Sequence, residues 1–259
     1  MLFLVSTVTC ERPGFFEKSC EYSLSEEYVL GMRVARAKLM VYEGMKEKKL
    51  RKNARKLASE LRMRNVGQVI LSEQFPRISE FESFEKADSA YLYERIAGYV
   101  GIRASGGGGT AAFITATIGA AEEQSLLSLA GAYRHLILIT GRDCEAVCHN
   151  LRSHFGVAVI ANPTESQMER ADFVAILSKT HRPLNLKPDC IVYSPDPENF
   201  YGIEGGKRIV AIKLKIAGEI AERVPLGFEQ APIISAAIRH GFCRVVDVGV
   251  QDILLDNVR

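Results

Sequence analysis

The chain has 259 residues, of which 47% are hydrophobic and 25% are charged, and its formal net charge is +2. A chain of this length buries enough apolar surface to fold without a disulfide or a metal, and this composition excludes a disordered or fibrous protein. The longest apolar runs have the length of strands, far below the roughly 20 residues that span a bilayer, so no membrane-spanning segment is expected.

The first apolar run, LFLVSTVT at 2–9, predicts a buried strand. A targeting signal is the alternative, but a basic n-region is missing and the run lies at the lower limit of length for the apolar core of a signal peptide. We therefore expect this run to belong to the fold and the protein to reside in the cytoplasm.

The six cysteines are scattered along the chain without a CxxC pair, which argues against a zinc ribbon and a thioredoxin-type redox motif. Cys144 and Cys148 lie four residues apart on one face of an expected helix, with His149 beside them, and two thiols at this spacing could share a metal. The further ligands of a tetrahedral site have no sequence signal. We therefore interpret both cysteines as small buried hydrophobic residues and expect no metal site.

Residues 1–104 mix strand and helix signals and predict a smaller α+β domain. Strands are expected at 2–9, 20–24, 37–42 and 66–73, with a long basic helix at 45–65. A second helix is expected at 88–101, where DSAYLYERIAGYVG has helical spacing after a candidate cap at Asp88.

Four consecutive glycines, Gly106 to Gly109, separate the two parts of the chain. Such a run could cradle a phosphate, because its backbone N–H groups can point at an anion. A P-loop also needs a lysine, then Ser or Thr, then a helix, whereas this run leads into Thr110 and the strand-prone AAFITATI. A flexible linker is the favoured interpretation, and we place a domain boundary between residues 104 and 105.

From residue 105 onward, short runs rich in Val, Ile and Thr alternate with helical patterns. Strands are expected at 111–118, 135–140, 157–162, 172–178, 189–194, 208–215 and 243–250. Helices are expected after the first two strands and ahead of the last one. This alternation predicts that residues 105–259 form a parallel sheet with right-handed crossovers and helices on both faces, an α/β domain.

The stretch HLILITGRDCEAVC, at 135–148, predicts a strand that runs through a glycine into a helix. The dinucleotide fingerprint G-x-G-x-x-G/A, aligned on Gly141, meets Asp143 at its second glycine and Ala146 at its third, so the second position does not fit. In its strand and helix rhythm, over about residues 105–259, the chain resembles the Rossmann-type dinucleotide-binding superfamily. The resemblance implies the fold and is silent about the ligand, because such folds carry many unrelated activities.

Polar residues at the strand ends argue against NAD or NADP in the usual pose. Asp143 would cap its helix and repel a diphosphate. The next strand ends at Asn162, where an NAD-binding relative usually carries an acid for the ribose hydroxyls. The turn at 118–123 also places two acids, Glu122 and Glu123, at a helix start.

Polar and charged residues follow four of the expected strands, at 140–143, 162–165, 178–182 and 194–197. Ligands of open parallel sheets bind beyond the carboxyl ends of the strands, so we expect a small anionic molecule or a nucleotide at this edge. The alternative is that these residues only form the turns and caps that such positions require. The candidate ligand-binding residues are Gly141, Arg142, Asp143, Asn162, Thr164, Lys179 and His181.

The helix at 46–64, from Lys46 to Arg64, carries nine Lys or Arg residues against two acids. Such a face could contact the phosphates of a nucleic acid. The small net charge of the chain and the absence of interleaved aromatic residues favour an ordinary solvated face instead. The apolar side chains of this helix fall on one stripe, which predicts packing against a sheet.

No GxSxG, HExxH or recognisable cysteine and histidine signature occurs, so the sequence names no catalytic residue and leaves open whether the protein is an enzyme. Two hypotheses remain. The first is a degenerate Rossmann-like domain that binds a small anionic molecule or nucleotide at the strand ends. The alternative is an interaction module, without catalysis, that has kept the fold and lost its cofactor; a homo-oligomer fits either one.

Overall fold

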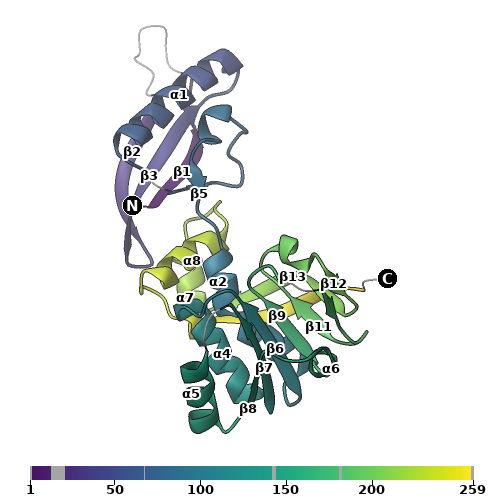
Figure 1. Ribbon diagram of the computed structural model, residues 1–259. Helices are drawn as coiled ribbons and strands as arrows, with labels where there is room; N and C mark the ends of the chain where they lie inside the picture. The colour runs from purple at the N-terminus through teal and green to yellow at the C-terminus, as the bar shows by residue number, and fades with distance from the viewer. Residues whose placement is uncertain (1, 13–20, 67, 142–143, 181–182, 258–259) are drawn as a thin grey trace. The chain divides into compact units, whose positions relative to one another are not determined.

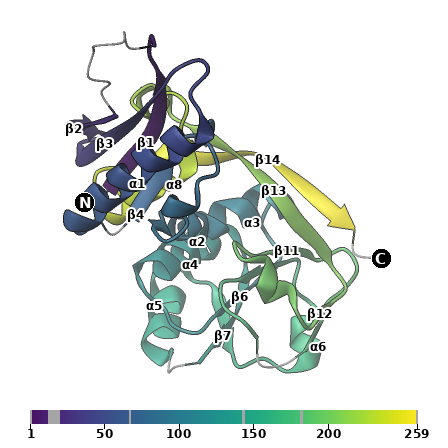
Figure 2. The same cartoon turned by 90° about the horizontal axis from the view of Figure 1, so that it is seen from above.

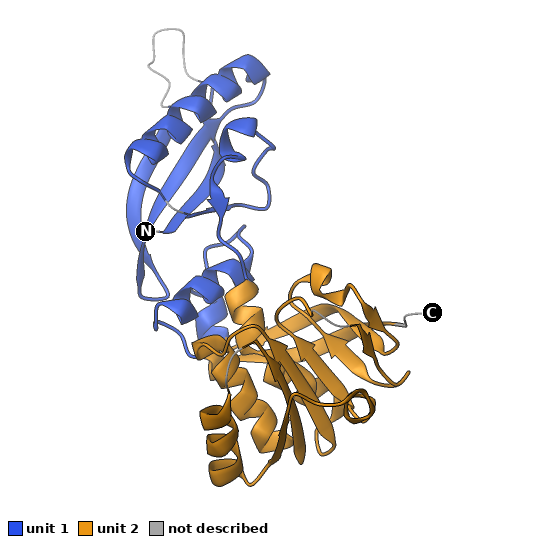
Figure 3. Ribbon diagram, in the orientation of Figure 1, with its two compact units in different colours: residues 1–89, 218–244 blue, residues 90–217, 245–259 orange. Residues whose placement is uncertain are grey.

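The computed structural model describes residues 2–12, 21–66, 68–141, 144–180 and 183–257. The chain forms two compact units, shown in Figure 3. Unit 1 contains Met1–Ser89 and Gly218–Arg244, and unit 2 contains Ala90–Ala217 and Val245–Arg259. The first boundary lies between residues 89 and 90, whereas the sequence predicted it between residues 104 and 105. In addition, the chain leaves unit 2 after residue 217 and returns to it at residue 245.

Unit 1 is built on a five-stranded sheet with the order β2-β3-β1-β4-β5 (Figure 1). The strands are β1 Leu2–Thr9, β2 Tyr22–Val29, β3 Met32–Val41, β4 Gln68–Leu71 and β5 Glu85–Lys86. β2 and β3 form a hairpin, and its two connecting residues, Leu30 and Gly31, both have positive φ angles, of 52° and 84°. Positive φ at both positions matches the right-handed twist of paired strands. The predicted strand at 2–9 is confirmed at both of its ends.

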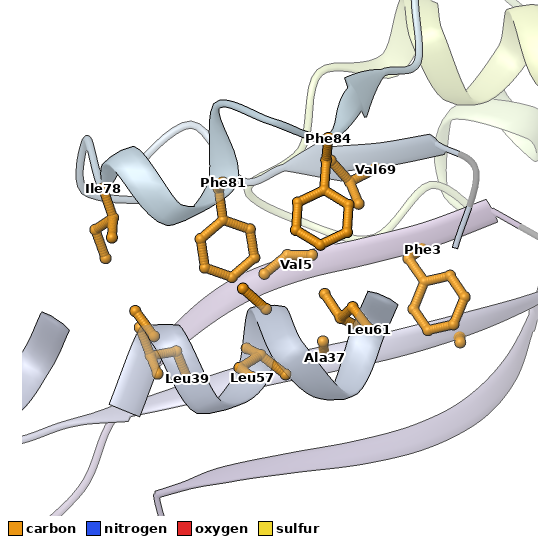
Figure 4. Packing of buried hydrophobic residues seen from close by; sticks show 13 residues of the cluster. Phe3, Val5, Ala37, Leu39, Leu57, Leu61, Val69, Ile78, Phe81 and Phe84 are labelled. Carbon is orange, nitrogen blue, oxygen red and sulfur yellow. The ribbon is translucent and has the colours of Figure 1, made fainter. Parts of the chain in front are cut away.

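The helix α1, Glu47–Met63, covers one face of this sheet. Its buried side chains Leu57 and Leu61 pack against Phe3 and Val5 of β1 and against Phe81 (Figure 4). Phe81 ends the short helix η1, Ser79–Phe81. The apolar stripe predicted for the basic helix therefore forms the centre of the unit 1 core.

Residues 218–244 belong to unit 1 through contacts with its strands and loops. They form α7, Gly218–Ala221, and α8, Gln230–Arg239. The carbonyl oxygen of Gly227 accepts a hydrogen bond of 2.9 Å from the backbone N–H of Glu73. The guanidinium of Arg36 lies 5.9 Å from the centre of the Phe228 ring.

Unit 2 contains a seven-stranded sheet with the order β14-β13-β11-β9-β6-β7-β8. The strands are β6 Thr110–Thr115, β7 His135–Thr140, β8 Ala158–Ala161, β9 Phe173–Ile176, β11 Ile191–Tyr193, β13 Lys207–Ile216 and β14 Val248–Asn257. The first six are parallel, and β14 runs antiparallel beside β13 (Figure 2). Counted along the chain, the parallel strands have the order 3-2-1-4-5-6, which is that of the doubly wound dinucleotide-binding fold. Unit 2 therefore has a Rossmann-type fold.

The two faces of this sheet are covered differently. On one face, α3 (Ala97–Ser105) packs on β9 and β11, and α4 (Ala120–Ala132) packs against both α3 and α5 (Glu145–Phe155). Gly101 of α3 lies against the ring of Phe173, because a Cβ at Gly101 would be 2.6 Å from Phe173 Cε1. The short helix α2, Ala90–Arg95, precedes α3 and also contacts α4.

Along a strand, successive side chains point to opposite faces of the sheet. Val174 of β9, next to Phe173, and Ala112 of β6 therefore face the side opposite to α3. There they pack in a cluster that includes Met168 and Leu184. This side is covered by the short helix α6, Glu165–Met168, and by a separate two-stranded sheet of β10, Leu184–Asn185, and β12, Ile203–Glu204. The remaining short helices are η2, Pro197–Phe200, and η3, Val245–Asp247.

The glycine run connects α3 to β6 inside unit 2. Gly106, Gly107 and Gly108 have positive φ angles of 76°, 73° and 88°, and the backbone N–H of Gly108 donates to the carbonyl oxygen of Ala132 at 2.8 Å. A flexible linker between two domains was expected here. The backbone hydrogen bond and the left-handed conformations instead define a tight turn, for which glycine is the residue with the lowest steric cost.

Among the helices of the described residues, none has the length and the apolar character needed to cross a membrane.

Candidate functional site

A pocket of about 710 Å³ lies beyond the carboxyl ends of the central strands of unit 2. Its lining comes from the ends of β6 and β7, the segments that follow β8 and β9, and parts of α6 and β10. β6 and β9 are neighbours in the sheet, and the strand order reverses between them. Ligands of doubly wound folds bind at this reversal, because the connections on its two sides diverge and leave a crevice.

Four of the seven predicted site residues line this one pocket: Gly141, Asn162, Thr164 and Lys179. They come from three different strand ends, so the sheet brings together residues that are up to 38 positions apart in the sequence. The other three, Arg142, Asp143 and His181, lie outside the described residues. Whether any of the seven binds a ligand stays a prediction.

The pocket has an apolar floor. Ile114 of β6 and Ile139 of β7 lie on the same face of the sheet as Met168 and Leu184, and all four line the pocket and belong to one apolar cluster. None of the four was among the predicted site residues. Met168 and Leu184 belong to elements of four and two residues, which are too short to show a hydrophobic period.

The rim of the pocket carries hydroxyl and amide groups. The hydroxyl of Thr140 lies 3.5 Å from the carbonyl oxygen of Ala116, and the backbone N–H of Thr164 donates to the side chain of Gln167 at 2.8 Å in a capping box. Asn162 has a left-handed backbone with φ of 52°. This conformation is tolerated by Asn more readily than by most residues, so a turn explains Asn at this position without any ligand.

The two charged residues among the described lining residues are paired. Lys179 donates a hydrogen bond of 2.7 Å to Glu198, and this bond and the charge of Glu198 raise the pKa of Lys179. Glu165 accepts a hydrogen bond of 2.7 Å from the side-chain amide of Asn185. Lys179 and Glu165 carry opposite charges, so the described lining residues have no formal net charge.

The strand order places the turn that corresponds to the diphosphate turn after β6, and not after β7 as the sequence predicted. In doubly wound folds this turn follows the first strand of the sheet, which here is β6, and the ribose-binding residue follows the second strand, which is β7. The sequence predicted the diphosphate turn at Gly141 and the ribose position at Asn162. Both predictions are shifted by one strand, because these residues follow the second and third strands and not the first and second. Gly141 instead occupies the region where ribose is held in such folds.

The turn after β6 lacks the glycines of the fingerprint and carries an acid. It runs from Ala116 to Gly119, and Glu122 in the first turn of α4 accepts a hydrogen bond of 3.0 Å from the backbone N–H of Gly119. The hydroxyl of Thr115 donates to the carbonyl oxygen of Thr117 at 2.7 Å and fixes the turn from the other end. A carboxylate thus takes a backbone donor that a diphosphate would use.

Basic side chains of α1 are engaged within unit 1. Among the described residues, four ion pairs involve this helix or the residue that follows it: Arg51 with Glu47, Arg55 with Glu80, Lys56 with Glu21, and Arg64 with Glu60. Arg62 donates to the Ser83 hydroxyl at 2.7 Å and lies over the Phe84 ring. These contacts reduce the positive charge that the helix presents, and nucleic-acid binding through it stays a prediction.

Within the described residues, no group of three or more His, Cys, Asp or Glu side chains is placed to hold a metal ion.

No protein-family model and no curated protein matches the chain. Among solved structures, similarity is found to the Δ1-pyrroline-2-carboxylate reductase of Thermococcus litoralis, solved with NADH and L-proline, at a TM-score of 0.33 and 9% identity. It is also found to the iminosuccinate reductase of Paracoccus denitrificans, solved with NAD+, at a TM-score of 0.30 and 16% identity. A third is the aspartate transcarbamoylase of Trypanosoma cruzi, at a TM-score of 0.33 and 15% identity.

The match covers 41% of this chain and 36% of the first protein, 62% and 51% for the second, and 78% and 72% for the third. The chain thus spans about a third to a half of the two reductases. The Rossmann-type assignment of unit 2 rests on its strand order, and these similarities assign no ligand or activity to it.

Proposed function

We propose that unit 2 binds a nucleoside or nucleotide in the pocket at the carboxyl ends of β6, β7 and β9. The observation that carries this proposal is the pocket itself, of about 710 Å³, at the reversal of the strand order. Its volume lies within the range of roughly 300 to 1,000 Å³ that small-molecule sites occupy.

The chemistry of the lining supports a base and a sugar as the bound groups. The apolar floor of Ile114, Ile139 and Met168 suits the faces of a planar heterocycle. Hydroxyl and amide groups on the rim, from Thr140 and Asn162, suit ribose hydroxyls. Gly141, at the end of the second strand, occupies the position beside which such folds hold the ribose.

The anionic part of the ligand is expected to contact residues that flank the described lining. Arg142 follows Gly141 directly in the chain, and His181 follows Thr180. In doubly wound folds an arginine near the end of the second strand can accommodate a ribose phosphate. We therefore expect a phosphorylated nucleoside to bind more tightly than the free nucleoside.

A second candidate function is an interaction module that has lost its cofactor. The hydrogen bond from Gly119 to Glu122 favours it, because the donor at the diphosphate turn is already used inside the protein. This alternative predicts no binding of adenosine, AMP, ADP-ribose, NAD+ or NADP+.

Thermal-shift measurements followed by calorimetry with these five compounds test the proposal. Ser178 lines the pocket, so a Ser178→Tyr variant should fill it and abolish binding of AMP. Ser153→Tyr is the matched control, because Ser153 lies exposed on α5 away from the lining. If no compound stabilises the wild-type protein, or if Ser178→Tyr binds as well as Ser153→Tyr does, the proposal is wrong.

A further inference from the structure

Cys144 and Cys148 place two thiols in contact at the start of α5. The Sγ atom of Cys148 lies 3.8 Å from that of Cys144, and both side chains are buried. Cys144 occupies the N-cap of the helix, with φ of −125° and ψ of 15°, and Cys148 lies one turn further along. Packing of two small apolar groups explains their burial, but it does not require the two sulfur atoms to meet.

We propose that Cys144 and Cys148 are a site of thiol oxidation and form a reversible disulfide. Residues four apart on a helix have Cα atoms about 6 Å from each other, from the rise and radius of the helix. This separation lies within the range that disulfides span. Closing the bond requires the sulfur atoms to approach by about 1.8 Å, to the S–S bond length of about 2.05 Å.

The N-cap position makes this approach possible. The carbonyl oxygen of Cys144 accepts a hydrogen bond of 2.8 Å from the backbone N–H of Cys148, so this carbonyl has to stay in place. Rotation about the Cα–Cβ bond of Cys144 moves its sulfur and leaves this bond intact. Two cysteines four apart in the middle of a helix would have to unwind a turn to reach the same geometry. The required movement is therefore centred on the side chain of Cys144.

Hydrogen peroxide can serve as the oxidant in a reaction of two steps. The sulfur of Cys144, which accepts the hydrogen bond from the Cys148 thiol, attacks one peroxide oxygen. The O–O bond breaks, water leaves, and Cys144 becomes a sulfenic acid. The sulfur of Cys148 then attacks the Cys144 sulfur, the S–O bond breaks, and a second water leaves. Overall, two thiols and one peroxide give one disulfide and two waters: the two thiol hydrogens end in the waters, and the two electrons that the sulfur atoms lose reduce the O–O bond.

Cys190 provides an internal comparison, since it is more deeply buried, at 0% exposure against 7% for Cys144 and 3% for Cys148. Its Sγ atom lies 3.9 Å from the backbone carbonyl oxygen of Ile191, and burial raises the pKa of its thiol to about 12. The nucleophile in such oxidations is the thiolate, so Cys190 should resist peroxide. Cys10 is exposed and should react without selectivity.

The disulfide would act on the wall of the pocket. Gly141 lines the pocket, and only two residues separate it from Cys144. A displacement of Cys144 is therefore transmitted to the end of β7. We expect the oxidised protein to bind AMP several-fold more weakly than the reduced protein; this consequence rests on the proposed function, whereas formation of the disulfide does not.

Peptide mass spectrometry tests the site directly. Folded protein is treated with peroxide, the peroxide is removed, and the protein is then denatured in the presence of iodoacetamide and cut with trypsin. Cleavage after Arg142 and Arg152 releases residues 143–152, which contain both cysteines. We expect this peptide to lose two hydrogens, to carry no alkyl group, and to gain two alkyl groups when dithiothreitol is added before alkylation.

Two variants complete the experiment. Cys148→Ser should stop the reaction at a sulfenic or further oxidised Cys144, whereas Cys190→Ser should leave the disulfide unchanged. The peroxide treatment of the wild-type protein tests the proposal by itself, so the test holds even if one of the variants fails to fold. The proposal is overturned if residues 143–152 are recovered with both thiols intact when Cys10 is already oxidised, whether or not AMP binds.

Discussion

Glu122 accepts a hydrogen bond of 3.0 Å from the backbone N–H of Gly119, in the turn that follows the first strand of the unit 2 sheet. The pair forms one half of a capping box: the acid in the first turn of the helix satisfies the donor at the N-cap, and Gly119 has no side chain to return a second hydrogen bond. In doubly wound folds the same place holds the diphosphate of a dinucleotide. A structural cap and a diphosphate therefore compete for one position, and in this chain the cap occupies it.

Replacing Glu122 by Gln should increase the affinity for diphosphate ligands. The amide oxygen of Gln can still accept from Gly119, so the cap is kept and only the negative charge is removed. A charge at a helix N-terminus contributes roughly 0.3 to 2 kcal/mol, which corresponds to an increase in affinity of up to about 30-fold. We expect ADP-ribose and NAD+ to bind more tightly to Glu122→Gln by calorimetry, with adenosine unchanged.

Glu123→Gln is the matched control, because Glu123 is the next residue, is exposed and carries the same charge. An equal gain in both variants would show a general effect of net charge. Equal binding of NAD+ and AMP to the wild-type protein would contradict the idea that Glu122 excludes a diphosphate, while leaving nucleotide binding itself intact.

The sequence predicts six of the seven strands of the unit 2 sheet near their observed positions, because each contains a short apolar run. The last strand was expected at 243–250 and is observed at 248–257. HLILIT is observed as β7 with both ends as expected. The order of these strands depends on pairings between residues far apart in the chain, such as Ala112 with Val174, and no local pattern carries that information. Without the order, the turn after β7 looked like the diphosphate turn, although the turn after β6 holds that place.

The same limit applies to the return of residues 218–244 to unit 1 and to the floor of the pocket. Ile233 and Ile234 of α8 show that the segment is an ordinary buried helix, but not which core it joins. Leu184 lies between Pro183 and Asn185 in a strand of only two residues, so no hydrophobic period identifies it as part of a strand. The polar rim was predictable, since Gly141 and Asn162 directly follow strands that could be located.

Two helical glycines should respond to alanine in opposite directions. A Cβ at Gly101 would lie 2.6 Å from Phe173 Cε1, so the ring or the helix must move, at a cost of about 1 to 3 kcal/mol. A Cβ at Gly131 of α4 meets nothing within 4 Å, and alanine there should stabilise the helix by about 0.5 to 1 kcal/mol. Urea unfolding of both variants measures the difference. A stabilised Gly101→Ala would mean that α3 does not lie against Phe173.

The ion pair of Asp172 and Lys187 should make the stability of unit 2 depend on pH. Burial raises the pKa of Asp172, but the hydrogen bonds from Lys187 and from the backbone N–H of Thr110, at 2.8 Å, together lower it below its ordinary value. The hydrogen bond and the charge of Asp172 raise the pKa of Lys187. A carboxyl group whose pKa is lower in the folded state stabilises the folded protein at pH values above its unfolded-state pKa of about 3.9. This contribution is lost as the pH falls through the folded-state pKa.

The raised pKa of Lys187 acts at the other end of the range. Its contribution is complete below the unfolded-state pKa of about 10.4 and is lost as the pH rises through the folded-state value. Asp172→Asn should therefore lower the free energy of unfolding by about 1 kcal/mol near neutral pH, since the pair is partly exposed to solvent. The deficit should vanish in strong acid. Urea unfolding across this pH range, with the exposed Glu169→Gln as control, checks it; a constant deficit at every pH would rule out the ion pair as its cause.

Asn53 in the core of unit 1 should be replaceable by Leu with a gain in stability. The residue is 2% exposed, and its side-chain oxygen Oδ1 has no hydrogen-bond partner among the described residues. An unpaired buried acceptor costs about 1 to 3 kcal/mol. Leu has the same branched shape and places a methyl group where the oxygen lies, beside Ala54 and Leu57 of the same helix.

We expect Asn53→Leu to raise the free energy of unfolding by about 1 to 2 kcal/mol, of which helix propensity supplies up to about 0.5 kcal/mol. Asn53→Asp keeps the shape and adds a buried charge, so it should lower the free energy of unfolding by about 3 kcal/mol or more. Urea unfolding of the two variants separates packing from polarity. If Asn53→Leu gains no more than the roughly 0.5 kcal/mol expected from helix propensity, or if Asn53→Asp is as stable as the wild type, the proposed cost of an unpaired oxygen is wrong. Either result would show that Oδ1 has a hydrogen-bond partner or a bound water in solution.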